Sequence, residues 1–277
     1  MRRLRRAAVI VPLALAACVV GAAPALASHS RTTTTTRVSA SLSGVGKPAR
    51  TRLKIELNGQ AVYDKLVRSS FCHADCSLTA VPPGKKVVKV IALQPGGGLD
   101  VVLGLYSGGA HCCFLDQVFS QVPGTTRFVK AEYNFLDAGA RLERLHGAWV
   151  FMSSDARIAE EGFTDFADSS APIQILDFAG GRFVDITRRY PSLIRPDAAR
   201  WLRAFRHNPS NNAGLIAGWA ADEYLLGNYA STNATLNHYA AERVFTSALG
   251  LPHHSQTAFV RELKRDLRAL GYVGAGA

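Results

Sequence analysis

The chain has 277 residues, of which 48% are hydrophobic and 19% are charged, and its 32 lysines and arginines outnumber its 21 acidic residues. This apolar fraction is ordinary for a globular protein and excludes a disordered chain, a collagen-like chain and a membrane protein with many spans. The formal net charge of +11 favours contact with anionic partners. Because the basic residues are scattered rather than gathered in blocks, no specific nucleic-acid recognition is predicted.

Residues 1–27 have the pattern of a secretory signal peptide. The first six residues are basic, Ala7–Val20 is apolar apart from Pro12, and Ala25-Leu26-Ala27 fits a cleavage site. We therefore expect a secreted, extracellular protein that is cleaved before Ser28. Loss of four arginines with this segment lowers the excess of basic over acidic residues from 11 to 7.

One alternative for the N-terminal region is a lipid anchor. Leu15-Ala16-Ala17-Cys18 has the form of a lipobox, which would leave Cys18 lipidated and the protein attached to a membrane. After removal of the signal peptide no apolar run approaches the ~20 residues of a membrane span, so no transmembrane segment is expected in the mature chain.

Residues 28–48 are predicted to be an exposed linker. They include five consecutive threonines, Thr32 to Thr36, with serine and glycine and few large apolar side chains. Such a composition contributes little to a hydrophobic core. The folded part is therefore expected to begin near residue 49.

From residue 49 to 192 the pattern is that of short strands joined by turns. Leu53, Ile55 and Leu57 alternate with charged residues before Asn58-Gly59, which is a strong hairpin signal. Further strands are expected at 86–93, 99–106, 117–122, 127–135, 148–152, 172–178 and 182–187. About eight to ten such strands favour an antiparallel β domain built as a sandwich or as propeller-like blades.

From residue 193 to 277 the apolar period becomes helical. The last helix is the best defined, because Ser255 can cap it, apolar residues recur every three or four positions from Val260 to Leu270, and Gly271 suits its C-terminal end. Other helices are expected from Pro196 to Phe205, at 211–226 and at 236–249. The predicted fold class is therefore α+β, an antiparallel β domain followed by a C-terminal helical region.

Four cysteines remain after signal cleavage: Cys72, Cys76, Cys112 and Cys113. An even number in an exported chain predicts two disulfides. Adjacent Cα atoms are only about 3.8 Å apart across a trans peptide, which is below the usual disulfide range. The sequence therefore favours pairing of Cys72 and Cys76 with Cys112 and Cys113.

Two histidines beside these cysteines open other possibilities. Four thiolates with His73 and His111 would form a soft-ligand set for a metal, and His111 could act as the base for a neighbouring nucleophilic cysteine. The spacing matches no common zinc site, however, and the members of a catalytic dyad usually come from separate segments. We therefore expect no metal, no cofactor and no catalytic residue, and we take His73, Tyr106 and His111 as candidate binding residues.

Acidic residues cluster in a second place, around Gly162-Phe163-Thr164. They are Glu160, Glu161, Asp165 and Asp168. Without a second, distant carboxylate at an identifiable spacing, they are interpreted as part of a surface loop.

The segment from Asp100 to Cys113 ends in Tyr-Ser-Gly-Gly-Ala-His-Cys-Cys. It resembles a signature of secreted bacterial proteins related to FG-GAP/VCBS-type repeats, and 171–191 resembles a companion region, so the resemblance covers about residues 85–191. It implies a propeller-like or sandwich β unit in an extracellular protein and implies no activity. The loop 93–100 holds a single carboxylate, whereas calcium needs six to eight oxygen ligands, so no calcium site is expected there.

These features together predict an exported, non-enzymatic binding module of the cell exterior or envelope. Its partner would be an extracellular ligand, for example an anionic envelope polymer. The alternative is an extracellular hydrolase whose catalytic residues come together only in three dimensions.

Overall fold

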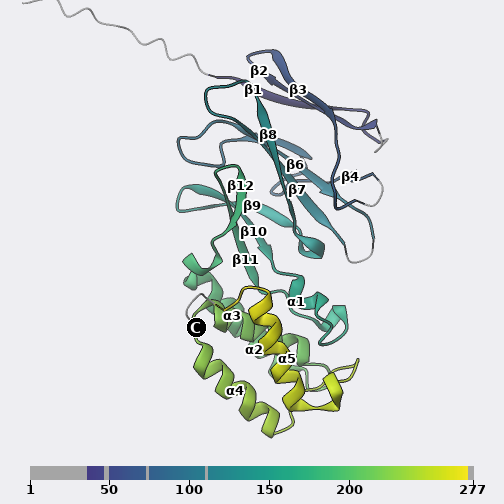
Figure 1. The fold of residues 1–277 in the computed structure, drawn as a ribbon, viewed down its shortest axis with the longest axis vertical. Coiled ribbons are helices and arrows are strands. Elements are labelled where there is room, and N and C mark those ends of the chain that lie inside the picture. The colour runs from purple at the N-terminus through teal and green to yellow at the C-terminus, as the bar shows by residue number, and fades with distance from the viewer. Residues whose placement is uncertain (1–35, 47–49, 73–74, 110–111, 274–277) are drawn as a thin grey trace, which may run out of the picture. The chain divides into compact units, whose positions relative to one another are not determined.

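The computed structural model describes residues 36–46, 50–72, 75–109 and 112–273. The signal peptide, Cys18, His73 and His111 lie outside these residues. Within them the chain forms three antiparallel sheets followed by a helical region (Figure 1). This architecture confirms the predicted α+β class.

The first sheet has the strand order β1 (Val38–Ser43), β2 (Arg52–Leu57) and β3 (Gln60–Leu66). The predicted hairpin is confirmed: Asn58 and Gly59 have φ angles of 53° and 84° and connect β2 to β3. The linker prediction for 28–48 is wrong for residues 38–43. Val38, Ala40 and Leu42 share one face of β1 and pack in the core. Serines occupy the alternate positions, so the segment resembles a linker in composition.

The central sheet contains β4 (Ser77–Leu78), β5 (Val88–Ile91), β6 (Asp100–Tyr106), β7 (Phe114–Gln121) and β8 (Phe128–Asn134). Strand β6 pairs with β4, β5 and β7, and β7 also pairs with β8. The strands expected at 86–93, 99–106, 117–122 and 127–135 are present as β5 to β8, and β7 begins three residues earlier than predicted.

The third sheet has the order β12 (Arg182–Asp185), β11 (Ile173–Ala179), β10 (Ala148–Ser154) and β9 (Ala140–Leu145). The strands expected at 172–178 and 182–187 are confirmed and pair with each other as β11 and β12. The third sheet also contains β9, which was not predicted. Its alternation is obscured by charged residues at 141, 143 and 144.

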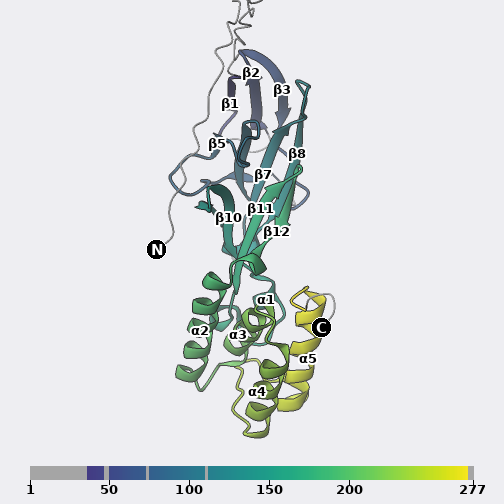
Figure 2. The ribbon, with the colours of Figure 1, turned by 90° about the vertical axis from the view of Figure 1, so that its left-hand side faces the viewer.

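The three sheets pack in succession, with the central sheet between the other two. One face of the central sheet, including Leu103 and Phe119, packs with Ile55 of the first sheet. The opposite face, including Val118, packs with Phe151 of the third sheet. The sheets therefore form a layered sandwich (Figure 2), and the propeller-like alternative is not confirmed.

The helices are α1 (Arg157–Glu160), α2 (Pro191–His207), α3 (Ala213–Leu225), α4 (Tyr229–Ala241) and α5 (Gln256–Ala269), and short 3₁₀ turns lie at Leu136–Ala138, Phe166–Asp168, Thr187–Arg189 and Pro252–His254. The capping prediction for α5 is confirmed, because the Ser255 side chain accepts a hydrogen bond from the N–H of Ala258 at 3.3 Å. Among the described helices, none is both long and apolar enough to cross a membrane.

Two helix boundaries differ from the predictions. Helix α2 begins at Pro191 rather than Pro196, because Pro191 also suits a first turn, where a missing N–H costs nothing. The helix predicted at 236–249 lies at 229–241, because small and polar residues at 230–235 join it, and Arg243 adopts a positive φ that ends it.

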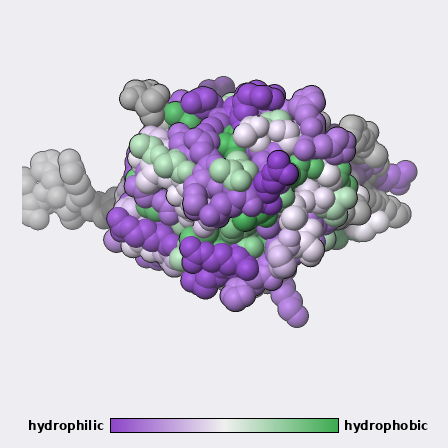
Figure 3. Space-filling model, turned by 90° about the horizontal axis from the view of Figure 1, so that it is seen from below, coloured by the Kyte–Doolittle hydropathy of each residue, from purple (hydrophilic) through white to green (hydrophobic). Residues whose placement is uncertain are grey.

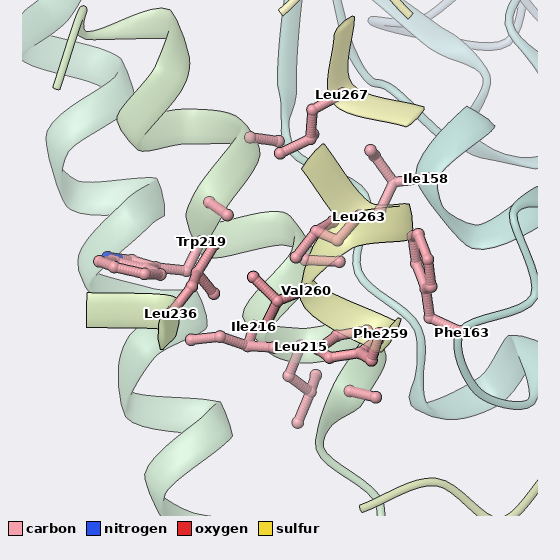
Figure 4. Packing of buried hydrophobic residues seen from close by; sticks show 14 of the residues in the cluster. Ile158, Phe163, Leu215, Ile216, Trp219, Leu236, Phe259, Val260, Leu263 and Leu267 are labelled. Carbon is pink, nitrogen blue, oxygen red and sulfur yellow. The ribbon is translucent and has the colours of Figure 1, made fainter. Parts of the chain in front are cut away.

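The helical region has its own apolar core, which the helices share with the segment between β10 and β11 (Figure 4). Ile216 and Trp219 of α3 pack with Phe259 and Leu263 of α5. Ile158 of α1 belongs to the same core. Hydrophilic residues cover most of the face seen from below, with small apolar areas between them (Figure 3).

The helical core also buries a carboxyl group. Asp222 of α3 is fully buried, and no donor among the described residues reaches either of its oxygens. Burial, and then the neighbouring Asp197 carboxylate, raise the pKa of Asp222 to about 9, while Arg200 acts in the opposite direction. Asp197 itself accepts hydrogen bonds from Arg200 and from the N–H of Ile173 on β11. At neutral pH, therefore, Asp222 is protonated.

Replacing Asp222 with Asn should stabilise the protein at neutral and alkaline pH. The folded chain keeps the Asp222 proton up to about pH 9, whereas the ordinary pKa is 3.8, so this group's contribution to stability is greatest below pH 3.8 and is lost as the pH rises to about 9. We compare the free energy of unfolding of Asp222→Asn with that of the wild type at each pH. The difference should favour the variant more at pH 8 than at pH 4, by on the order of 2–4 kcal/mol. Urea denaturation across this range measures it.

Asp197→Asn is the matched control, because it removes the negative charge and one of the two oxygens that accept hydrogen bonds from Arg200 and Ile173. It should lower stability at both pH values. Equal pH dependence in the wild type and in Asp222→Asn would contradict the assignment.

Candidate functional site

A cleft of about 460 Å³ opens between the central and third sheets. Its central-sheet wall includes Phe114 and Asp116 of β7, with Phe135 just beyond β8. The third sheet contributes residues 152–154 of β10, and residues 79–82 close another side. The cleft therefore interrupts one end of the apolar layer between the two sheets.

Asp116 reaches this cleft because of the pleat of β7. Alternate residues of a strand point to opposite faces, so Asp116 shares a face with Val118, which is buried against the third sheet. The residue opposite Asp116 on β6 is Gly104. A Cβ atom at Gly104 would lie 2.6 Å from the carbonyl oxygen of Thr79, so only glycine lets the 79–82 segment lie this close to Asp116.

The Asp116 carboxyl group is buried and has no hydrogen-bond donor among the described residues. Its exposed fraction is 7%. Burial raises its pKa to about 7, while the Lys89 ammonium of β5 acts in the opposite direction. Lys89 donates to the carbonyl oxygen of Pro83 at 2.5 Å, and Arg141, in the cleft wall, is paired with Glu143. Asp116 therefore exchanges between its neutral and ionised forms near neutral pH.

Asp116 belongs to a row of four polar residues between the two sheets. Tyr133 lies opposite Asp116 in the register of β7 and β8, and Ser153 lies opposite Gln174 in the register of β10 and β11. The Gln174 amide donates a hydrogen bond to the Tyr133 hydroxyl at 3.2 Å, which connects the central sheet to the third. Ser153 donates to the carbonyl oxygen of Gly139 at 2.5 Å.

The four cysteines form two close pairs, and each pair joins sequence neighbours. Cys72 pairs with Cys76, with their Cα atoms 5.6 Å apart, and Cys112 pairs with Cys113. The predicted cross-pairing between the two segments is therefore wrong. The Cα atoms of Cys112 and Cys113 are 3.1 Å apart across a cis peptide.

Of the three candidate binding residues, Tyr106 lies within the described structure. Its hydroxyl donates to the carbonyl oxygen of Gly109, and its ring packs against Phe114 with the ring centroids 5.0 Å apart. Because Phe114 lines the cleft, Tyr106 supports the cleft wall without being part of it. His73 and His111 lie outside the described residues.

Two acidic residues of the predicted surface loop, Asp165 and Asp168, take part in a structural contact. Asn211, just before α3, donates to Asp165 at 2.7 Å and to Asp168 at 2.6 Å. These bonds hold the loop against the start of α3. Within the described residues, no group of three or more His, Cys, Asp or Glu side chains is arranged to hold a metal ion.

Asp116 was not predicted as a site residue, although the sequence carries a signal for it. Asp116-Gln117 interrupts an otherwise apolar run from Phe114 to Phe119 in a strand that is buried on both faces. Polar residues at such positions need partners, because burying an unpaired carboxylate is costly. Gln117 has its partners, since it donates to Glu132 and to the carbonyl oxygen of Arg68.

No family model, curated protein or solved structure matches the chain. The functional argument therefore depends on the geometry of the cleft.

Replacing Asp116 with Asn should make the protein less sensitive to pH. The folded chain holds the Asp116 proton up to about pH 7 and the ordinary pKa is 3.8, so this contribution to stability is full below pH 3.8 and is lost as the pH rises to about 7. Relative to the wild type, Asp116→Asn should therefore gain on the order of 3 kcal/mol between pH 4 and pH 8, as measured by urea denaturation.

Asp100→Asn is the matched control in the neighbouring strand. Asp100 is similarly buried, but its carboxylate accepts hydrogen bonds from Ser120 and from the N–H of Leu93. This substitution should destabilise the protein at pH 8. A gain for Asp100→Asn equal to that for Asp116→Asn would show that the effect is not specific to the cleft.

Proposed function

We propose that the chain is an exported, non-enzymatic binding module that holds a small organic amine in the Asp116 cleft. The ammonium group would contact Asp116, and the apolar body of the ligand would contact Phe114, Phe135 and Ala140. The observation that carries this proposal is a buried carboxyl group that faces a cleft and has no donor among the described residues.

The chemistry of Asp116 favours a cationic partner. An ionised carboxylate in an apolar site is stable only when it is paired and hydrogen-bonded, and an ammonium group brings a positive charge with several donors. The cleft volume of about 460 Å³ is within the range of small-molecule sites. Its mixture of aromatic walls with a few polar and charged groups is typical of such sites.

Binding is favoured over hydrolysis by the composition of the cleft wall. Within the described lining, Asp116 is the single carboxylate, whereas glycoside hydrolysis usually needs two. The Ser153 hydroxyl donates to a backbone carbonyl rather than to a general base. The described wall therefore provides a recognition group without the second catalytic group that a hydrolase would need.

Export is supported by the N-terminal sequence and by the resemblance of residues 85–191 to secreted proteins with FG-GAP/VCBS-type repeats. An anionic envelope polymer, the partner predicted from the net charge, would be a partner of the basic outer surface. The carboxylate of Asp116 makes the cleft itself unsuitable for an anion.

Phenethylamine should bind to the purified mature protein, and it should bind more tightly as the pH rises. The ammonium pairs with ionised Asp116, so the affinity should increase about tenfold per pH unit below the Asp116 pKa of about 7 and level off above it. Asp116→Asn should lower the affinity at pH 8 at least tenfold and remove the pH dependence. Isothermal titration calorimetry measures both effects.

The neutral analogue 2-phenylethanol is the matched control ligand. It should bind more weakly than the amine at pH 8 and should not gain affinity as the pH rises. Tighter binding of the alcohol, or an unchanged affinity in Asp116→Asn, would contradict the proposal.

Export predicts a defined mature N-terminus. Expressed with its own first 27 residues in a bacterial host that secretes proteins, the chain should appear outside the cytoplasm and begin at Ser28. N-terminal sequencing and mass spectrometry test this. A lipidated Cys18 would support the anchored alternative, and an uncleaved cytoplasmic product would contradict export.

A further inference from the structure

Two adjoining polar cavities, together called the second cavity, lie beyond the Asp116 cleft, between the same two sheets and the start of the helical region. We infer that the second cavity binds the hydroxylated part of the same ligand. The ligand class is then an oligosaccharide with free amino groups. This inference rests on the proposed function, because it assigns an amino group of the sugar to Asp116.

The cleft and the second cavity are joined through shared walls. Phe135 and Ser154 line both the cleft and a smaller cavity of about 120 Å³. The smaller cavity in turn shares Tyr133, Arg157 and Gln174 with a cavity of about 450 Å³. A ligand that extends past Phe135 from Asp116 therefore meets the second set of polar groups.

The strand register sets the separation of the two sites. Asp116 and Tyr133 are directly opposite each other on β7 and β8, and such pairs have Cβ atoms about 4.5–5.5 Å apart. This spacing is comparable to the width of one sugar ring. An amino sugar at Asp116 and its neighbour at Tyr133 would therefore follow the row of polar residues.

Gln174 and Tyr133 provide complementary hydrogen-bonding atoms for a hydroxyl group. Gln174 is only 4% exposed, and its amide nitrogen donates to the Tyr133 hydroxyl. No partner among the described residues contacts the amide oxygen of Gln174 or accepts the phenolic hydrogen of Tyr133. A sugar hydroxyl both donates and accepts hydrogen bonds, so it can satisfy both atoms.

Arg157 contributes fixed donors without adding net charge. Its guanidinium donates to Asp155, whose side chain is 6% exposed, and Asp155 also accepts a hydrogen bond from Tyr272 at 2.7 Å. The Arg157 side chain remains 42% exposed. A guanidinium held and neutralised in this way suits neutral hydroxyl groups better than an anion.

The two cavities are lined by three arginines, Arg157, Arg188 and Arg189, and by two carboxylates, Asp155 and Asp185, which leaves a formal excess of one positive charge. The Arg188 guanidinium donates to backbone carbonyls of Tyr224 and Leu225 at the end of α3 and of Tyr272 after α5, where helix termini carry partial negative charge. The cavity thus combines many hydrogen-bonding groups with little net charge, as a polyhydroxylated ligand requires.

The test compares three probes by calorimetry at neutral pH: phenethylamine, the β-1,4-linked trisaccharide of glucosamine, and its fully N-acetylated counterpart. The glucosamine trisaccharide should bind at least tenfold more tightly than its acetylated counterpart, which lacks the ammonium groups. Gln174→Met should weaken trisaccharide binding at least tenfold and leave phenethylamine binding within twofold. Tyr133→Phe, which removes a single oxygen atom, should have the same effect to a smaller extent.

Gln117→Met is the matched control, because Gln117 is equally buried but lies on the opposite face of the central sheet. Gln117→Met should leave the binding of both amine probes, phenethylamine and the glucosamine trisaccharide, unchanged. If phenethylamine binds and the trisaccharide does not, or if Gln174→Met and Tyr133→Phe leave the trisaccharide affinity unchanged, the oligosaccharide inference is overturned and the amine site stands. If neither amine binds, both proposals fail.

Discussion

The central sheet must be apolar on both of its faces, because the first sheet covers one face and the third sheet covers the other. Strands β6 and β7 satisfy this requirement with nearly continuous apolar side chains, and the clusters around Phe119 and Phe151 follow from it. Such burial on two sides is the main source of stability for a layered β protein. It also means that any polar residue in these strands must have a partner or a function.

Two polar residues of β7 show the two outcomes. Gln117 faces the first sheet, and its amide nitrogen donates to Glu132 and to a backbone carbonyl, so it is part of the structural framework. Asp116 faces the third sheet, and no described residue donates to its carboxyl group. The same strand therefore contains one polar residue whose partners are part of the packing and one that faces a cleft with no donor among the described residues.

Much of the fold follows from local sequence patterns. Asn58-Gly59 specifies a hairpin, and Ser255 and Gly271 mark the two ends of α5, because turn and cap residues act over a few positions. The site depends on contacts that no local pattern encodes. Gly104 is required by the carbonyl of Thr79, and Tyr133 meets Gln174 from a strand 41 residues away in the sequence.

The hydrogen bond between Tyr272 and Asp155 joins residues 117 positions apart. Asp155 follows the last residue of β10, and Tyr272 follows α5, so the bond links the third sheet to the end of the helical region. The geometry of Asp155, and with it that of the Arg157 side chain that pairs with Asp155, therefore depends on a residue near the far end of the described chain. A truncation that removes Tyr272 would alter this cavity while leaving every strand in place.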